Sequence, residues 1–276
     1  MSLNSVNTNV GAQIALQNLQ KTNSELATTQ NRINTGKAIN SAKDNGAIWA
    51  IAQSQRAESA SLNAVKSSLQ RGQSTVDVAL SAGESVSDLL TQMKSLALSA
   101  SDASLGTAAR ASLNEDFISL RDRITTVVAN ASFDGTNLIN AGTAGFKALA
   151  NAKGTSTINV AQQNLSLGGT IVTVAAAGVV SSATAAAAMI TTVDTSIRNV
   201  STALSKLGTG SKAFENHLTF VGKLQDSLDA GVGNLVDADL AKESARLQSL
   251  QTKQQLGVQA LSIANSSSSI LLGLFR

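Results

Sequence analysis

The sequence of 276 residues contains no cysteine, no proline and no tyrosine, and only 3% of its residues are aromatic. Without cysteine the chain can form no disulfide and offers no thiolate ligand for a metal such as zinc. Proline removes a backbone donor and interrupts helices, so its absence from so long a chain favours long uninterrupted helices. The lack of cysteine fits either the cytoplasm or an exported protein that folds without oxidation.

Residues that carry chemistry are also scarce. His217 is the only histidine, and neither a zinc site nor a Ser-His-Asp triad can be built from one histidine alone. The glycine pairs Gly208/Gly210 and Gly231/Gly233 lack the third glycine of a dinucleotide-binding loop, and no phosphate-binding P-loop motif occurs. We therefore expect no enzyme, with no catalytic, cofactor-binding or metal-binding residue and no cofactor.

Charge is sparse as well, since only 14% of the residues are charged and the net charge of +3 is spread along the chain. Nucleic-acid binding typically requires a basic stripe or interleaved aromatics, so no nucleic acid is expected as a partner. Residues 154–193 carry no charge, but glycines interrupt them and Ala and Thr dominate, so membrane insertion is not expected. The first 20 residues show no Sec-type signal peptide.

What the sequence does contain is a heptad repeat that begins at residue 48. Between Leu62 and Ala100 the two series of seam positions hold only apolar residues or glycine. This 3.5-residue period predicts a helix that packs along a narrow stripe against another helix. At 1.5 Å per residue a helix over 48–100 is about 80 Å long, which exceeds a compact domain and implies a rod.

Two more helices are predicted to pack beside it. A turn over 101–106 leads to a helix over 107–130 that should fold back on the first, and residues 190–235 carry a seam with twelve of fourteen positions apolar. The fold class is therefore mainly α, an elongated antiparallel helical bundle or coiled coil. The predicted core of the rod consists of Leu62, Val65, Leu69, Val76, Leu90, Met93, Leu113, Phe117, Ile197, Val200, Leu204, Leu207, Phe214, Leu218 and Val221.

The segment 133–180 follows a different pattern. Phe133-Asp134-Gly135 is typical of a turn. Residues 164–167 and 170–174 flank Gly168-Gly169, which predicts a β-hairpin with a two-residue loop. We expect this small β-rich region at the tip of the rod.

Both ends of the chain are patterned as helices but poorly filled. Their seams include Thr22, Thr29, Gln254, Gly257 and Ser268, so neither end should hold a helix alone in water. We expect both ends to order only when they pair with each other and with neighbouring copies. The predicted domains are terminal helices (1–43 with 237–276), a helical rod (44–132 with 181–236) and the β-rich excursion (133–180). The residues expected to drive self-assembly are Leu16, Leu19, Leu26, Ile33, Leu247, Leu250, Leu256, Leu261, Ile263, Leu271, Leu272, Leu274 and Phe275.

The two ends also carry motifs of a known family. Residues 6–19 read VNTNVGAQIALQNL and residues 32–47 read RINTGKAINSAKDNGA, and both resemble the N-terminal signature of bacterial flagellin. The FDGTNLI run at 133–139 resembles the turn after the flagellin N-terminal helices, and LGVQALSIANSSSSILLGLFR at 256–276 resembles the flagellin C-terminus. The short, proline-free chain is most similar to alphaproteobacterial flagellins.

The resemblance implies a structural subunit that self-polymerises into the bacterial flagellar filament, a propeller for swimming. Its terminal helices would form the inner filament core. The implied partners are further copies and paralogous flagellins, the flagellar export machinery, a secretion chaperone, and the hook-associated and cap proteins. The implied location is extracellular, reached without a cleaved Sec signal. Where many flagellins carry a basic residue in the motif recognised by a mammalian innate receptor, this sequence has Gln92, with Leu96 nearby, so weak receptor activation is expected.

Two other interpretations compete. A flagellin-like hook–filament junction protein would share these ends but would not polymerise alone. A cytoplasmic coiled-coil adaptor would carry charged residues beside the seam for partner choice, whereas Ser, Thr, Asn and Gln fill the flanks here.

Overall fold

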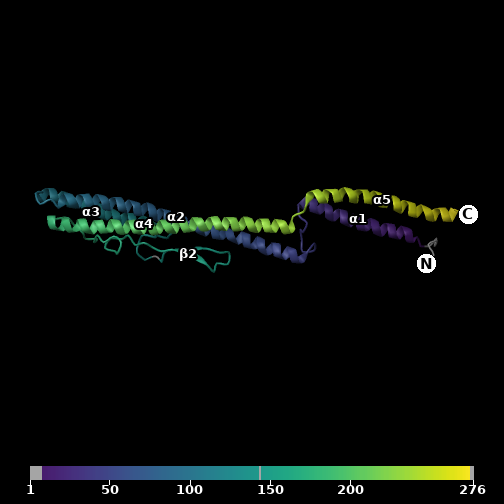
Figure 1. Cartoon of the computed structure of the whole chain (residues 1–276), viewed down its shortest axis with the longest axis horizontal. Coiled ribbons are helices and arrows are strands. Elements are labelled where there is room, and N and C mark those ends of the chain that lie inside the picture. Colours follow the sequence, from purple (N-terminus) through teal and green to yellow (C-terminus); the bar gives the residue numbers. More distant parts are fainter. Residues whose placement is uncertain (1–7, 143, 274–276) are drawn as a thin grey trace. The chain divides into compact units, whose positions relative to one another are not determined.

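The computed structural model describes the backbone of residues 8–142 and 144–273, and the side chains of these ranges up to residue 266. In these residues the chain forms five helices and two strands (Figure 1). Their order is α1 (Val10–Thr35), α2 (Gly46–Ala100), α3 (Thr107–Asn130), β1 (Phe146–Leu149), β2 (Thr157–Val160), α4 (Ala183–Val236) and α5 (Leu240–Gly273). The described residues divide into two compact units, one formed by the residues up to Ala57 and from Ser227 onward, the other by Glu58–Asp226.

In the unit Glu58–Asp226, α2 and α4 run antiparallel along a shared seam. Lys66 Nζ donates to Gln225 Oε1 at 2.6 Å near one end of the pair, and Lys94 Nζ lies 2.6 Å from Asp194 Oδ1 near the other. The third helix, α3, folds back on α2, and the Arg110 guanidinium near its start donates to the Ala100 carbonyl at 3.0 Å. The prediction of an antiparallel helical bundle is therefore confirmed.

The buried side chains of this unit follow the heptad seams. The predicted core residues with 2% or less exposure are Leu62, Val65, Leu69, Val76, Leu90, Met93, Phe117, Val200, Leu207, Phe214 and Val221. Leu113, Ile197, Leu204 and Leu218 are half-buried.

The hairpin is present, but it does not involve the residues that the sequence predicted. The antiparallel strands are β1 and β2, with Phe146 paired to Val160 and Leu149 paired to Thr157. Asn151 organises the loop between them, because its Oδ1 accepts from Thr155 N at 3.0 Å. The loop turns at Gly154, whose φ of 69° favours glycine.

The predicted strands over 164–174 are wrong, for a specific reason. The alternating apolar residues do point inward, and Leu165, Val172 and Val174 are fully buried. The backbone amides of this segment, however, do not bond to a neighbouring strand. Leu165 N donates to the Ile139 carbonyl at 2.8 Å, and Thr173 N donates to Ser196 Oγ of α4 at 2.9 Å.

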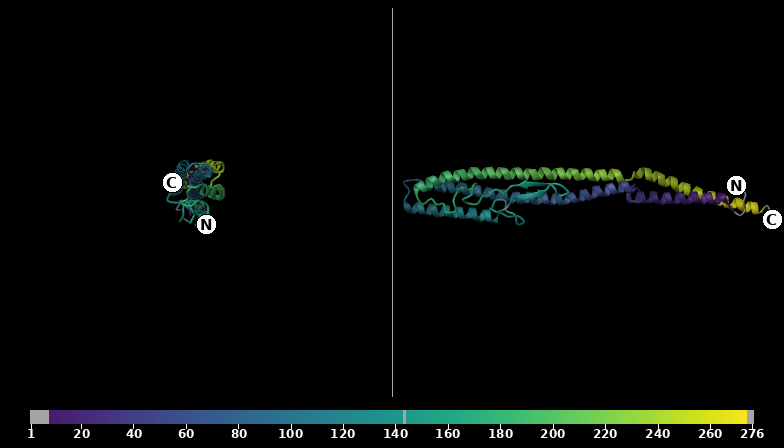
Figure 2. Two further views of the ribbon diagram at one scale, coloured as in Figure 1. Left: turned by 90° about the vertical axis from the view of Figure 1, so that its left-hand side faces the viewer. Right: turned by 90° about the horizontal axis from the view of Figure 1, so that it is seen from below.

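The strands also do not lie at the tip of the helices. Leu149 N donates to Ser68 Oγ of α2 at 3.1 Å, and the Phe146 ring packs edge-on against Phe214 of α4 with centroids 6.2 Å apart. The hairpin therefore lies along the sides of α2 and α4, as Figure 2 shows. The turn between α2 and α3 forms the end of this unit instead. Space for the hairpin comes from Gly72, where an added Cβ would approach the Phe146 ring to 2.8 Å.

Candidate assembly surface

The first helix, α1, has defined ends. Asn9 Oδ1 accepts from Ala12 N at 2.9 Å, which caps the free donors of the first turn. Gly36 ends the helix with a φ of 69°, a conformation that costs other residues energy. The Asn9 side chain has a second role, because its Nδ2 donates to the Ala264 carbonyl of α5 at 2.7 Å. The cap of the first helix is thereby connected to the last helix.

Helices α1 and α5 pair antiparallel in one constant register. The contacts from one end of the pair to the other are Asn9 with Ala264, Leu19 with Gly257, Asn23 with Gln254, and Arg32 with Glu243. An added Cβ at Gly257 would lie 3.2 Å from Leu19 Cδ1, so Leu19 occupies the space that glycine leaves. At this position the thin seam predicted from the sequence is a match between a large side chain and a glycine.

One layer of this seam contains an ion pair. Arg32 Nη1 lies 3.1 Å from Glu243 Oε1, and the side chains are 31% and 11% exposed. Glu243 lies in the first turn of α5, where the helix dipole favours a negative charge. In the described structure Arg32 Nε and Glu243 Oε2 are buried and have no hydrogen-bond partner. A buried pair of this kind contributes more to the choice of register than to net stability.

The outer surface of the pair changes character along its length. From Val10 to Gln20 and from Gln254 to Gly273 there is no charged residue. Apolar side chains are exposed in this neutral half: Ile14 is 54%, Leu256 59% and Ile263 68% exposed. The other half carries Lys21, Arg246 and Lys253 among other charges. We call the exposed apolar residues of this half, on whichever side of the pair they lie, the neutral face: Val10, Ile14, Leu16, Leu256, Val258 and Ile263.

The predicted assembly residues take three kinds of position. Leu250 is buried, Leu16, Leu256 and Ile263 are exposed, and Leu19, Leu26, Ile33, Leu247 and Leu261 are half-buried. Leu271 and Leu272 belong to α5, but their side chains lie outside the described residues, as do Leu274 and Phe275 altogether. Thr29, a seam position in the sequence, is buried, whereas sequence reasoning missed the buried Glu243 and the exposed Ile14 and Val258. Glu243 could have been found by extending the heptad from Leu250 back through 247.

The segments that join these helices to the rest of their unit are also linked to each other by backbone hydrogen bonds. Ala38 N donates to the Val236 carbonyl at 2.8 Å, and Ala238 N donates to the Gly36 carbonyl at 2.9 Å. Beyond them, Asp44 Oδ2 accepts from the amides of Asn40 and Ser41 and from the Ser41 hydroxyl. The backbone hydrogen bonds from Ser41 and Asn40 lower the pKa of the Asp44 carboxyl.

Other residues noted in the sequence lie apart from this surface. Gln92 is exposed and Leu96 half-buried, both in a shallow groove between α2 and α3. The His217 ring lies 2.7 Å from the Ala150 carbonyl and packs against Phe220, a structural arrangement. Among the residues that the structure describes, no cluster of three or more His, Cys, Asp or Glu could hold a metal. In the same residues, no helix is long and apolar enough to cross a membrane.

Comparison with known proteins decides the family. The N-terminal helical region of bacterial flagellin matches residues 6–144, and the C-terminal helical region matches residues 190–275. The chain belongs to the bacterial flagellin family. Flagellin FljM and flagellin FljK of Caulobacter vibrioides are each 60% identical to it, over all of both chains. A flagellin of Brucella melitensis is 38% identical over 99% of each chain. A crystal structure of Bacillus cereus flagellin aligns with 55% of this chain and 86% of that one, at 20% identity and a TM-score of 0.49.

Membership of this family confirms the resemblance seen at both ends, including the likeness to alphaproteobacterial members. The chain is a structural subunit of the bacterial flagellar filament, and motility is the general role of flagellins. The family polymerises with itself and with paralogues into extracellular filaments.

Proposed function

We propose that this chain polymerises through the neutral face of the α1–α5 pair. The observation that supports the proposal is the combination of exposed Ile14, Leu16, Leu256, Val258 and Ile263 with the absence of charge on the same half of the pair. Soluble proteins rarely leave such an apolar group uncovered unless it binds something. In a filament each pair has several neighbours, so side chains that face solvent in one copy can be buried by others.

Residues 1–43 with 237–276 then form the inner core of the filament, and 44–132 with 181–236 form the shell around it. The α1–α5 seam alone offers little burial, since Ala12, Ala15, Thr22 and Gly257 occupy many of its positions. Ordering a residue costs about 1–2 kcal/mol of backbone entropy, which only further burial can offset. The terminal helices therefore become stably helical upon assembly.

This coupling suits export. A subunit whose ends remain unfolded before assembly can pass through the flagellar export machinery with a secretion chaperone and without a Sec signal. It then adds to the growing end of the filament under the cap protein. Hook-associated proteins lie at either end of the filament. Premature polymerisation in the cytoplasm is avoided because the binding surface does not exist until the ends fold.

The first test is a pair of substitutions on the neutral face. Ile263 is 68% exposed, so Ile263→Ser should leave the monomer folded while removing burial in the filament. Burial of such a side chain contributes roughly 1–2 kcal/mol, so the critical concentration for seeded polymerisation should rise about 5- to 30-fold. Leu16→Ser should act in the same way. Gln248→Ser, an exposed neutral change on the charged half of α5, is the matched control.

Hydrogen exchange on monomers provides the second test. Amides of α1 and α5 should exchange rapidly in the monomer and become protected in the filament, whereas those of residues 62–100 should be protected in both. If Ile263→Ser and Leu16→Ser polymerise at the wild-type critical concentration, the neutral face is not the assembly surface. If the terminal amides of monomers exchange as slowly as those of residues 62–100, folding is not coupled to assembly.

A further inference from the structure

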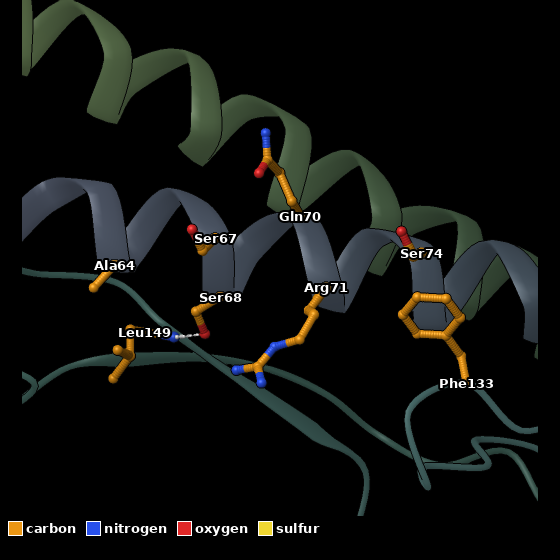
Figure 3. A pocket seen from close by; sticks show the side chains of 8 residues that line it. All are labelled: Ala64, Ser67, Ser68, Gln70, Arg71, Ser74, Phe133 and Leu149. Carbon is orange, nitrogen blue, oxygen red and sulfur yellow. Dashed lines mark hydrogen bonds between the residues drawn. The ribbon is translucent and has the colours of Figure 1, made fainter.

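A second surface of the chain has the features of a subunit contact. In the unit Glu58–Asp226 a groove of about 610 Å³ lies between α2, the turn that carries Phe133 and the end of β1 at Leu149. Figure 3 shows these two apolar side chains on either side of Arg71, with Ser67 and Ser68 on the adjoining face of α2. Phe133 is 36% exposed. The groove therefore offers two apolar walls and one cation to a partner.

The cation is available for a new partner. Arg71 is paired with Asp134, but Nη1 and Oδ2 are 3.7 Å apart and the side chains are 58% and 66% exposed. An ion pair that is long and solvated in this way contributes little. A carboxylate that entered the groove could therefore compete for Arg71 at little cost.

The end of the same unit carries a complementary feature. Leu98, in the last turn of α2, is 62% exposed, although its neighbours Ala97 and Ala100 are buried. Asp102 follows in the turn, where its Oδ1 accepts from Ser104 N at 2.9 Å and from Ser104 Oγ at 2.7 Å. The nearest arginine, Arg110, is bound to the carbonyls of Ala100 and Asp102 at 3.0 and 2.7 Å. The turn thus projects one large apolar side chain and one carboxylate.

We propose that the groove receives the α2–α3 turn of a second copy, with Leu98 between Phe133 and Leu149 and Asp102 paired with Arg71. Along α2 the groove and the turn are about 40 Å apart, so one copy cannot fill its own groove. Each copy supplies one groove and one turn. A contact between two different patches is heterologous, and it extends without limit when the copies form an open helix. The inference rests on the proposed function, because it assumes that the chain polymerises.

The absence of cysteine makes a direct test possible. Ser67 lines the groove and Ala103 lies in the turn, and both are exposed. The double variant Ser67→Cys/Ala103→Cys, assembled into filaments and oxidised, should yield a ladder of covalent oligomers on a non-reducing gel, because every copy carries both partners. Each single variant should yield none. The control Ser205→Cys/Ala103→Cys, with the first cysteine at an exposed position of α4 outside the groove, should also yield none.

Filaments of the double variant without a ladder would overturn the proposed contact, and so would an equal ladder from the control. Neither result bears on the proposal that the chain polymerises through the neutral face, because that proposal is tested by the critical concentrations of Ile263→Ser and Leu16→Ser. If the double variant does not assemble, charge reversal decides the question. Arg71→Glu and Asp102→Arg should each raise the critical concentration at least about threefold, and the combined variant should restore it. If the increases in critical concentration caused by the two single variants multiply in the combined variant, the Arg71–Asp102 pairing is excluded. These variants are compared in an Asp134→Asn background, which removes the intrachain competitor.

Discussion

Replacing Gly72 by alanine should destabilise the unit Glu58–Asp226, although the same change usually stabilises a helix. A Cβ at this position would lie 2.8 Å from Phe146 Cε1 and 2.9 Å from Phe214 Cε2. Phe214 is fully buried, and the two rings hold each other in an edge-on arrangement with an interplanar angle of 78°. Neither ring can move without disturbing the contact of the hairpin with α2 and α4.

The magnitude follows from opposing effects. Alanine gains about 1 kcal/mol over glycine in a helix interior. Overpacking of a filled core costs about 1–3 kcal/mol, and disturbance of an aromatic pair adds about 0.5–1.5 kcal/mol. We expect a net loss of about 0.5–3.5 kcal/mol, which for a unit of this size lowers Tm by about 1–14 °C.

The measurement is urea and thermal unfolding of the monomeric full chain, followed by circular dichroism. Gly222→Ala is the matched control, because a Cβ there meets nothing within 4 Å, and it should raise Tm. Phe146→Leu in the Gly72→Ala background removes part of the clash and should recover some of the loss. If Gly72→Ala and Gly222→Ala shift Tm in the same direction by the same amount, the argument from close packing is refuted.

Four further predictions concern single positions. Leu69→Ala should lower the free energy of unfolding by about 2–4 kcal/mol, because Leu69 is 1% exposed in the seam. Urea unfolding measures this loss, and a loss smaller than that of a substitution at an exposed site would contradict the prediction. Glu243→Gln should weaken the α1–α5 pair by about 1–3 kcal/mol, because the partly buried Arg32 charge loses its countercharge. The filament melting temperature measures this, and an unchanged value would show that the ion pair is dispensable. The Asp44 carboxyl has a lowered pKa, so its ionised form stabilises the turn at and above the ordinary pKa of aspartate, and this contribution is lost as pH falls through the lowered pKa. The protection of the Ser41 amide against exchange, relative to its intrinsic rate at each pH, should fall over that range, and an Asp44→Asn chain should lack this pH dependence. The exposed Gln92 should give weak activation of the mammalian flagellin receptor, and full potency in a cell reporter assay would contradict this.

The helices could be predicted because their signal is local and repeated. A seam such as that of Leu62, Leu69 and Val76 places an apolar residue every 3.5 positions, and only a helix brings these residues to one face. The absence of proline allowed the same pattern to continue without a break. The boundaries found for α2 and α4 therefore lie close to the predicted ones at their outer ends, and α4 begins earlier only because an alanine-rich stretch precedes its seam.

The hairpin could not be placed, because its determinants are not local. Residues 165, 172 and 174 alternate as strands do, and they are buried as strand residues would be. The amide of Leu165 donates to the Ile139 carbonyl and the amide of Thr173 to Ser196 Oγ of α4, and no short window of sequence reveals these partners. The real strands are only four residues long each, and the room for Phe146 depends on Gly72 in another element.

The candidate assembly surface could be predicted in part from the sequence. The thin terminal seams indicated that α1 and α5 need partners, and the exposed Leu16, Leu256 and Ile263 fit that expectation. The register of the pair was not visible, because it depends on Leu19 meeting Gly257 and on Arg32 meeting Glu243 across more than 200 residues of chain. Complementarity between two helices is a property of the pair, and neither sequence shows it alone.

The pairing of the first helix with the last has a consequence for quality control. A chain that stops before Leu240 has no α5, so Leu19 has no Gly257 to pack over and Arg32 no carboxylate to meet. Such a chain can still fold the unit Glu58–Asp226, whose contacts are internal. It cannot present a completed terminal pair. Under the proposed assembly through that pair, a truncated copy lacks the surface needed for incorporation, so assembly itself selects completely synthesised subunits.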